Sequence, residues 1–196
     1  MRPSTALLAL MLTGCMSTSN LPPVQYYVLS DAGPAARARP AGLNSRVIVV
    51  QAASVSAFYD TQRLVYSRAP GARAYYQFAA WTERPGRTFS ELLSRRLNAP
   101  STTSGVKGDL ILNTRLEELY HDVSVKPGLV RIEVSAELVD ASGRLVSERR
   151  RFTRSVPAGE ENAEAAVAAA NRAISQVLDD VAGWLDGQAA DAVARL

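Results

Sequence analysis

The 196-residue sequence has few of the residues on which metal sites and disulfides depend, because it contains one cysteine and one histidine. A single cysteine cannot form an internal disulfide, and this pair is too small for a zinc site of the cysteine–histidine type. Any catalytic scheme that needs two imidazoles is excluded as well. We therefore expect one domain held together by its hydrophobic core, since a chain of this length buries roughly 70% of the surface exposed on unfolding.

Lysine is also scarce, because only Lys107 and Lys126 stand among the 22 basic residues. The arginines are spread over most of the chain, and the formal net charge is only +3. Domains that bind nucleic acid usually concentrate their basic residues in one stripe. The distribution therefore predicts no nucleic-acid partner.

The sequence lacks the phosphate-binding loop, the dinucleotide-binding glycine turn and the nucleophile elbow. His121 is the only candidate for a general base near neutral pH. The Lys-Pro-Gly segment at 126–128 is typical of a turn, so we interpret His121 as a surface or loop residue whose replacement costs less than about 0.5 kcal/mol. Asp122 cannot orient its ring, because consecutive strand residues point to opposite faces. We predict no enzyme activity, no catalytic residue, no cofactor and no metal.

The first fifteen residues have the organisation of a bacterial export signal. Arg2 precedes an apolar run from Ala6 to Leu12, and the small residues Thr13 and Gly14 stand directly before Cys15. The run is too short to cross a bilayer core about 30 Å thick, which takes about 20 helical residues. It resembles the lipobox of bacterial lipoproteins, whose cysteine receives a diacylglyceryl group and becomes the new N-terminus. An ordinary secreted protein with an unmodified cysteine is the alternative.

The lipobox implies that residues 1–14 are removed as a signal peptide and that Cys15 is the lipidation site. Two or three acyl chains anchor a protein far more firmly than one myristoyl chain does. No run of 18 apolar residues follows, so we expect a periplasmic domain anchored to a membrane without crossing it. An aspartate after the lipidated cysteine often marks retention at the inner membrane. Met16 stands there instead, which favours the periplasmic face of the outer membrane, with the inner membrane as the alternative.

Hydrophobic periodicity predicts strands and helices after a lipidated tether at residues 15–24. The expected strands cover residues 26–29, 46–50, 63–67, 74–79, 110–117, 130–138 and 144–156. In two of them, 110–117 and 130–138, apolar and polar residues alternate. Such alternation is typical of an antiparallel sheet with one dry face and one wet face.

Two helices are expected to pack on the dry face. Thr88 and Glu91 have the spacing of a capping box at the start of the first helix. Its apolar side carries Phe89, Leu92, Leu93 and Leu97. The second helix has regular apolar spacing over residues 163–185. We predict a single α+β domain over residues 25–187, an antiparallel or mixed sheet with two helices packed on one face, followed by a C-terminal tail at 188–196.

One dense charge cluster, Glu-Arg-Arg-Arg-Phe-Thr-Arg, lies in the last expected strand. If Phe152 points to the core, Arg149 and Arg151 share the wet face, where they can meet carboxylates or phosphates. The predicted turn at 140–143 folds the last two strands together. We therefore expect Arg131 to lie close to both and to be repelled by them, at up to about 1 kcal/mol per pair. These three arginines are candidate partner-binding residues, and an edge strand charged against aggregation is the alternative.

Aromatic motifs along the mature chain resemble those of a known family. After the lipobox come Tyr-Tyr-Val-Leu at 26–29, Tyr59-Asp60 leading into Arg-Leu-Val-Tyr at 63–66, Tyr-Tyr-Gln-Phe at 75–78, and Trp81. These features resemble the ABC-type transport auxiliary lipoproteins, the PqiC-like proteins, from Tyr26 to about Leu185. Residues 30–43 match no part of the pattern.

The resemblance implies a lipid-anchored periplasmic accessory component of an MCE/ABC-type lipid transport system, acting by protein–protein contact in the cell envelope. The implied partners are an MCE-domain periplasmic protein and inner-membrane permease components. Assembly into a homo-oligomer is a further alternative. The chain has no nucleotide-binding loop, so we expect ATP hydrolysis to take place elsewhere. An envelope structural or assembly lipoprotein unrelated to a transporter is the alternative function.

Overall fold

Residues 21–33 and 46–194 are described by the computed structural model of the chain. In chain order their elements are β1 (Gln25–Tyr27), β2 (Ile48–Val50), β3 (Ser54–Val55), the 3-10 helix η2 (Ala57–Tyr59), β4 (Arg63–Ser67), β5 (Ala74–Trp81), α1 (Pro85–Arg96), the 3-10 helix η3 (Thr102–Ser104), β6 (Leu110–Asp122), β7 (Leu129–Asp140), β8 (Leu145–Pro157) and α2 (Ala163–Ala194). Cys15, the expected signal peptide and most of the expected tether lie outside the described residues.

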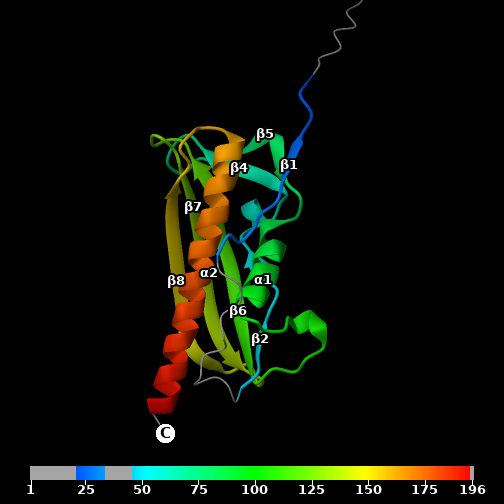
Figure 1. Cartoon of the computed structure of the whole chain (residues 1–196), viewed down its shortest axis with the longest axis vertical. Coiled ribbons are helices and arrows are strands. Elements are labelled where there is room, and N and C mark those ends of the chain that lie inside the picture. Colours follow the sequence, from blue (N-terminus) through cyan, green and yellow to red (C-terminus); the bar gives the residue numbers. More distant parts are fainter. Residues whose placement is uncertain (1–20, 34–45, 195–196) are drawn as a thin grey trace, which may run out of the picture.

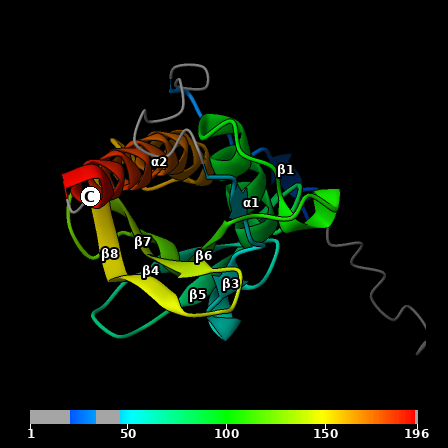
Figure 2. The ribbon, with the colours of Figure 1, turned by 90° about the horizontal axis from the view of Figure 1, so that it is seen from below.

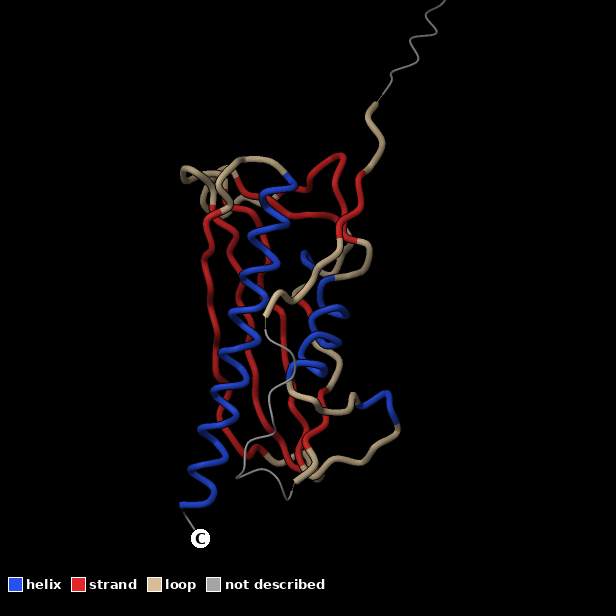
Figure 3. Tube along the Cα trace, in the orientation of Figure 1, coloured by secondary structure: helices blue, strands red, loops and turns tan. Residues whose placement is uncertain are grey.

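Strand β6 is the centre of the sheet, because four other strands, β2, β3, β4 and β7, pair with it in the described part of the chain. The strand order is β1-β5-β4-β6-β7-β8, with β2 and β3 also paired to β6. Strands β2, β3 and β4 run parallel to β6 at successive positions along it, whereas β7 is antiparallel to β6 and to β8. Within the described residues, β1 and β8 form the two ends of this path (Figure 3).

The core lies between the sheet and the two helices, which cover the same face (Figures 1 and 2). Alternate residues of β6 and β7 point into it, as the sequence predicted, and so does the apolar side of each helix. Its fully buried members include Leu112, Ile132, Phe89, Leu93, Ile174 and Leu178. The predicted α+β fold, a mixed sheet with two helices on one face, is therefore confirmed.

The predicted start of α1 is wrong. The helix begins at Pro85 with Arg84 as its N-cap, and no side chain caps it. Thr88 lies inside the helix and its hydroxyl approaches the Arg84 carbonyl at 3.5 Å. Proline at the first helical position supplies a helical φ and has no N–H to satisfy, so this helix starts without the capping box that the Thr-x-x-Glu spacing suggested.

A β-bulge in β6 reverses the alternation that the sequence predicted for the strand. The pairing with β7 shifts by one residue between Leu116 and Glu118. Leu116 faces the helices before the bulge, and Leu119 does so after it. His121, two residues further on, therefore points to the same side and is only 2% exposed. Its interpretation as a surface or loop residue is wrong.

Candidate functional site

The face of the sheet that the helices leave uncovered carries paired charges along β6, β7 and β8. Because strand residues two apart share a face, polar residues of these strands gather there. The shortest contacts are Arg115 with Glu117 at 2.8 Å, Arg131 with Asp122 at 2.8 Å, Arg149 with Glu137 at 3.0 Å and Arg151 with Glu133 at 3.1 Å. We call these eight residues the ion-pair face.

The predicted repulsion among the three candidate arginines is wrong, because each one pairs with a carboxylate of a neighbouring strand. They also do not form one cluster. Arg131 lies opposite Ser155 and donates to its hydroxyl at 3.3 Å, whereas Arg151 lies opposite Ser135. Four residues of β7 separate these positions, which is about 13 Å along a strand. Arg149 and Arg151 thus form one basic pair, and Arg131 stands apart from it.

Arg149 and Arg151 remain accessible although they are paired. Their side chains are 63% and 69% exposed, whereas their carboxylate partners are mostly buried. Exposed ion pairs contribute only about 0–1 kcal/mol, and a guanidinium has five N–H donors, more than one carboxylate can use. A carboxylate or phosphate from outside the chain can therefore bind these arginines, and the free energy of unfolding would change little if an internal ion pair were weakened.

Glu117 lies at the middle of the ion-pair face and accepts hydrogen bonds from Arg115, Ser135 and Ser56. Burial raises its pKa, but these hydrogen bonds outweigh the burial, and the pKa of Glu117 lies below its usual value. It is ionised at neutral pH and is not suited to donate a proton. A hollow of about 350 Å³ beside it is lined mainly by polar groups, Asn113 and Arg149 among them. This surface is suited to hold polar groups of a partner.

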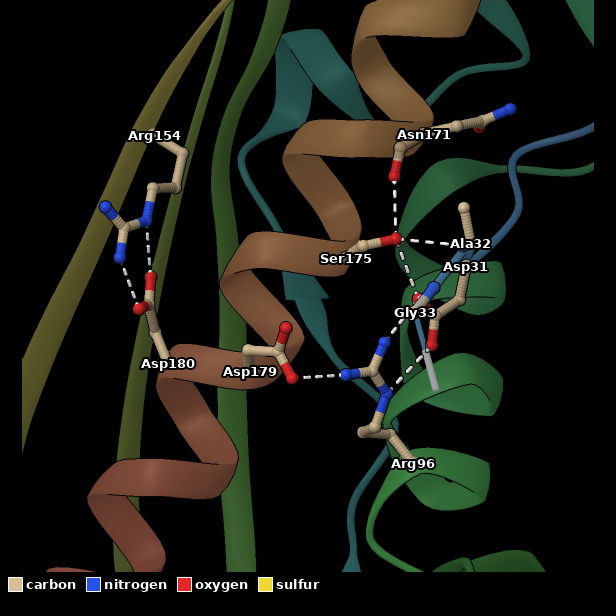
Figure 4. Close-up of polar contacts among 9 residues, drawn as sticks. All are labelled: Asp31, Ala32, Gly33, Arg96, Arg154, Asn171, Ser175, Asp179 and Asp180. Atoms are coloured by element: carbon tan, nitrogen blue, oxygen red, sulfur yellow. Dashed lines mark hydrogen bonds and ion pairs between the residues drawn. The ribbon is translucent and has the colours of Figure 1, made fainter. Parts of the chain in front are cut away.

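The dense charge cluster of β8 divides between the two faces of the sheet. Phe152 is buried in the core, as expected. Arg154 points to the helix side and forms a bidentate ion pair with Asp180 of α2 (Figure 4). The guanidinium of Arg150 lies 5.8 Å from the centre of the Phe152 ring. Only Arg149 and Arg151 are therefore presented together on the uncovered face.

Sequence reasoning missed a buried ion-pair cluster that joins the segment after β1 to both helices (Figure 4). The Arg96 side chain is fully buried, and its guanidinium contacts Asp31 and Asp179, each at 2.5 Å. Ser175 donates to Asp31 at 2.7 Å and accepts from the Ala32 N–H at 2.9 Å. One feature of the sequence could have revealed this cluster. Residue 96 follows the buried pair at 92 and 93 at helical spacing, so an arginine stands on the apolar side of α1.

A second missed feature is the buried pair of His121 and Tyr76. The Tyr76 hydroxyl and His121 Nδ1 share a hydrogen bond of 2.8 Å. Burial lowers the pKa of His121 and raises the pKa of Tyr76 to about 12, so both are neutral near pH 7. His121 Nε2 has no hydrogen-bond partner within the described residues. Gly128, at φ +95°, covers this nitrogen so closely that an added Cβ would lie 2.6 Å from it.

Comparison with known proteins decides the family. The sequence profile of the family described as "ABC-type transport auxiliary lipoprotein component" matches residues 27–182. The chain belongs to this family. Among curated proteins, none matches the chain. The described part of this auxiliary lipoprotein has no helix long and apolar enough to cross a membrane, and in residues 21–33 and 46–194 no three His, Cys, Asp or Glu side chains could together hold a metal ion.

Solved structures resemble this auxiliary lipoprotein in fold. A protein from Xanthomonas campestris is similar at a TM-score of 0.70 and 19% identity, over 84% of this chain and 97% of that one. A second protein, described only as uncharacterized, is similar at 0.65 and 16% identity, over 83% of this chain and 99% of that one. At such identities the likeness shows the fold alone. The whole architecture, rather than a fragment of it, is therefore shared with these proteins.

The buried histidine of this auxiliary lipoprotein should matter for stability. We expect His121→Ala to lower the free energy of unfolding by about 2–3 kcal/mol, because it empties a buried site beneath Gly128 and leaves the Tyr76 hydroxyl unpaired. Tyr76→Phe removes one hydroxyl only and should cost about 1 kcal/mol. Denaturant titration measures both. A cost below about 0.5 kcal/mol for His121→Ala would restore the interpretation of a surface histidine.

The same histidine predicts a dependence of stability on pH. Its pKa is lower in the folded protein than in the unfolded chain, so the unfolded chain binds the proton more readily. The stabilisation is complete above the unfolded pKa of about 6.5 and is lost as the pH falls through the lower folded value. Denaturant titrations at several pH values below 6.5 should show this loss in the wild-type protein and a smaller one in His121→Ala. Equal slopes in the two proteins would contradict it.

Proposed function

We propose that this protein is a lipid-anchored periplasmic accessory component of an MCE/ABC-type lipid transport system, located at the outer membrane. The observation that carries the proposal is membership of the auxiliary lipoprotein family over residues 27–182. We propose that the protein is not an enzyme and acts by contact with an MCE-domain periplasmic protein, which in turn connects it to inner-membrane permease components. Cys15 is the proposed lipidation site.

The ion-pair face and the β8 edge support contact as the mode of action. Strand β8 is thirteen residues long and lies at the end of the sheet path, so it offers unpaired backbone groups to an extended peptide. Arg149 and Arg151 flank that edge and remain accessible to carboxylates. We propose that an acidic extended segment of the MCE-type partner adds to this edge. Arg131 is the third proposed contact, at the other end of the same strand pair.

Reversing the charge of the basic pair should weaken partner capture. We expect Arg149→Glu with Arg151→Glu to reduce co-purification of the MCE-domain protein severalfold at low salt, because the new carboxylates repel an acidic segment. Folding should change little, since each substitution only turns an exposed ion pair into a like-charge pair. Undiminished capture at both low and high salt would contradict this role and would leave the arginines only the role of protecting the edge strand against aggregation.

A charge swap separates recognition from internal pairing. Adding Glu133→Arg and Glu137→Arg to the reversed protein restores both ion pairs with exchanged signs. We expect this fourfold variant to recover the wild-type unfolding free energy and still to capture the partner weakly. Full recovery of capture would mean that the partner needs intact ion pairs between β7 and β8 and does not depend on the positive charge of residues 149 and 151. Capture of cell-wall or outer-membrane assembly proteins alone would favour a structural lipoprotein.

A further inference from the structure

Exposed apolar side chains gather in the segment that enters the fold. The described part of the chain exposes few large apolar side chains, and four of them, Leu21, Val24, Tyr26 and Val28, lie within eight residues. Tyr26 and Val28 are each 62% exposed. We call these four residues the β1 patch. Most apolar side chains of the sheet point into the core instead, although Leu145 and Val146 at the start of β8 are exposed as well.

The β1 patch faces away from the helices. Tyr27 packs against the core and Leu29 is part of it, so the alternating residues Val24, Tyr26 and Val28 point the other way. The strand register agrees, because Tyr26 lies beside Ala80 and Ala80 lies opposite Arg63. Side chains that share a register position share a face of the sheet. The patch therefore lies on the uncovered face, next to Arg63.

Aromatic rings and an arginine lie on the surface next to the β1 patch. The Phe58 ring stacks on the Tyr75 ring at 4.8 Å, and the Arg63 guanidinium lies 4.4 Å from the centre of the Tyr75 ring. Arg63 makes no ion pair within the described residues. Aliphatic, tyrosine and unpaired arginine side chains together are the set that is stable at the boundary between lipid tails and water.

We propose that the β1 patch lies on the lipid bilayer that anchors the protein, so that the domain leans on its β1 edge. This inference rests on the proposed lipidation of Cys15. Leu21 lies six positions after Cys15, and an extended chain covers at most about 3.6 Å per residue, which holds Leu21 within about 22 Å of the lipid attachment point. The exposed apolar row that follows is thus kept near the membrane surface, within reach of it.

A strand added by a partner protein fits the β1 edge less well than a lipid surface does. Strand β1 is only three residues long, whereas β8 offers thirteen. A short edge gives few backbone hydrogen bonds, so the side chains must supply the contact. A bilayer surface accepts apolar and aromatic side chains without needing backbone partners. The geometry therefore fits a lipid surface better than an added strand.

The inference can be tested with a spin label, because an acylated Cys15 leaves no free thiol in the wild-type chain. Val28→Cys places the label in the patch. Leu145→Cys is a matched control, since Leu145 is a 53% exposed aliphatic residue that begins β8 at the end of the sheet away from segment 21–24 (Figure 1). Each acylated, full mature protein is reconstituted in vesicles of phosphatidylethanolamine and phosphatidylglycerol. Collision rates with oxygen, which enters lipid, and with a water-soluble nickel chelate are then compared.

We expect both proteins to float with the vesicles and the oxygen-to-nickel ratio to be severalfold higher at position 28 than at position 145. Equal, water-like ratios in floating protein would overturn the docking and leave the anchor intact. A ratio at position 28 that rises only after addition of the MCE-domain partner would also overturn it, and would assign the patch to that protein. Failure to float would overturn the anchor and the docking together.

Discussion

Replacing Arg96 with alanine is expected to lower the free energy of unfolding by about 3 kcal/mol, the largest loss that we expect from a single substitution in the domain. The guanidinium is fully buried and balances the charges of Asp31 and Asp179. Its removal leaves Asp31, itself mostly buried, without a counter-charge. The segment after β1 would then lose its main attachment to both helices, because Asp31 holds it between Arg96 and Ser175 (Figure 4).

Arg95→Ala is the matched control for this substitution. Arg95 is the neighbouring arginine of α1, but it is exposed, and its loss should cost less than about 0.5 kcal/mol. Denaturant titration of the two variants measures the difference. Equal stability of Arg96→Ala and Arg95→Ala would show that the buried cluster contributes nothing beyond the packing of the helix.

The same cluster predicts loss of stability in acid. Burial raises the pKa of Asp31, but hydrogen bonds from Arg96, the Gly33 N–H and Ser175 outweigh it, so the pKa lies below its usual value. A carboxyl with a lowered folded pKa stabilises the protein above its unfolded pKa, about 4, and this contribution disappears as the pH falls through the folded value. Stability measured below pH 4 should therefore fall less steeply in Asp31→Asn than in the wild-type protein. A steeper fall in the variant would contradict the assignment.

Cys15→Ser is expected to release the domain from membranes completely. The sulfur of Cys15 is the proposed attachment point of the lipid, and serine does not accept the diacylglyceryl group. Two or three acyl chains hold a protein almost permanently, whereas this domain alone offers only the small β1 patch. Cells labelled with a palmitate analogue and then fractionated give the answer. Wild-type protein should carry the label and sediment with membranes, and the variant should do neither.

The anchor would be contradicted by wild-type protein without label, or by a variant that still sediments with membranes in high salt. Ser17→Ala is a suitable control, because it lies near Cys15 in the tether and leaves the Leu-Thr-Gly-Cys motif intact. It should be labelled and should sediment as the wild-type protein does. Loss of label in this control would show that the tether, and not the cysteine alone, governs the modification.

Local periodicity was enough to predict the fold class. Alternation in β7 places Val130, Ile132 and Val134 in the core, and the 3, 4, 3 spacing of α2 places Ile174 and Leu178 against them. Each of these patterns is set by neighbours within one turn or one strand. The β4–β5 hairpin was predictable for the same reason, since its Pro-Gly turn lies between two aromatic strands.

The polar contacts depend on long-range register and could not be predicted in this way. A one-residue bulge in β6 turns the His121 side chain to the buried side of the sheet, and no residue type in that strand predicts the bulge. The partners of Arg149 and Arg151 follow from how β8 is shifted against β7, which the turn alone does not determine. Asp31 and Asp179 are 148 residues apart in sequence, so only the folded chain brings them to Arg96.

The most direct test of action by contact is photo-crosslinking in living cells. A photo-reactive amino acid replaces Thr153, which lies opposite Glu133 beside the basic pair, and a control replaces Arg150 on the helix side of the same strand. We expect the probe at position 153 to form an adduct with an MCE-domain protein of the envelope and the probe at position 150 to form none. Adducts only with cell-wall or outer-membrane assembly proteins, or the same adducts from both positions, would contradict the proposed role.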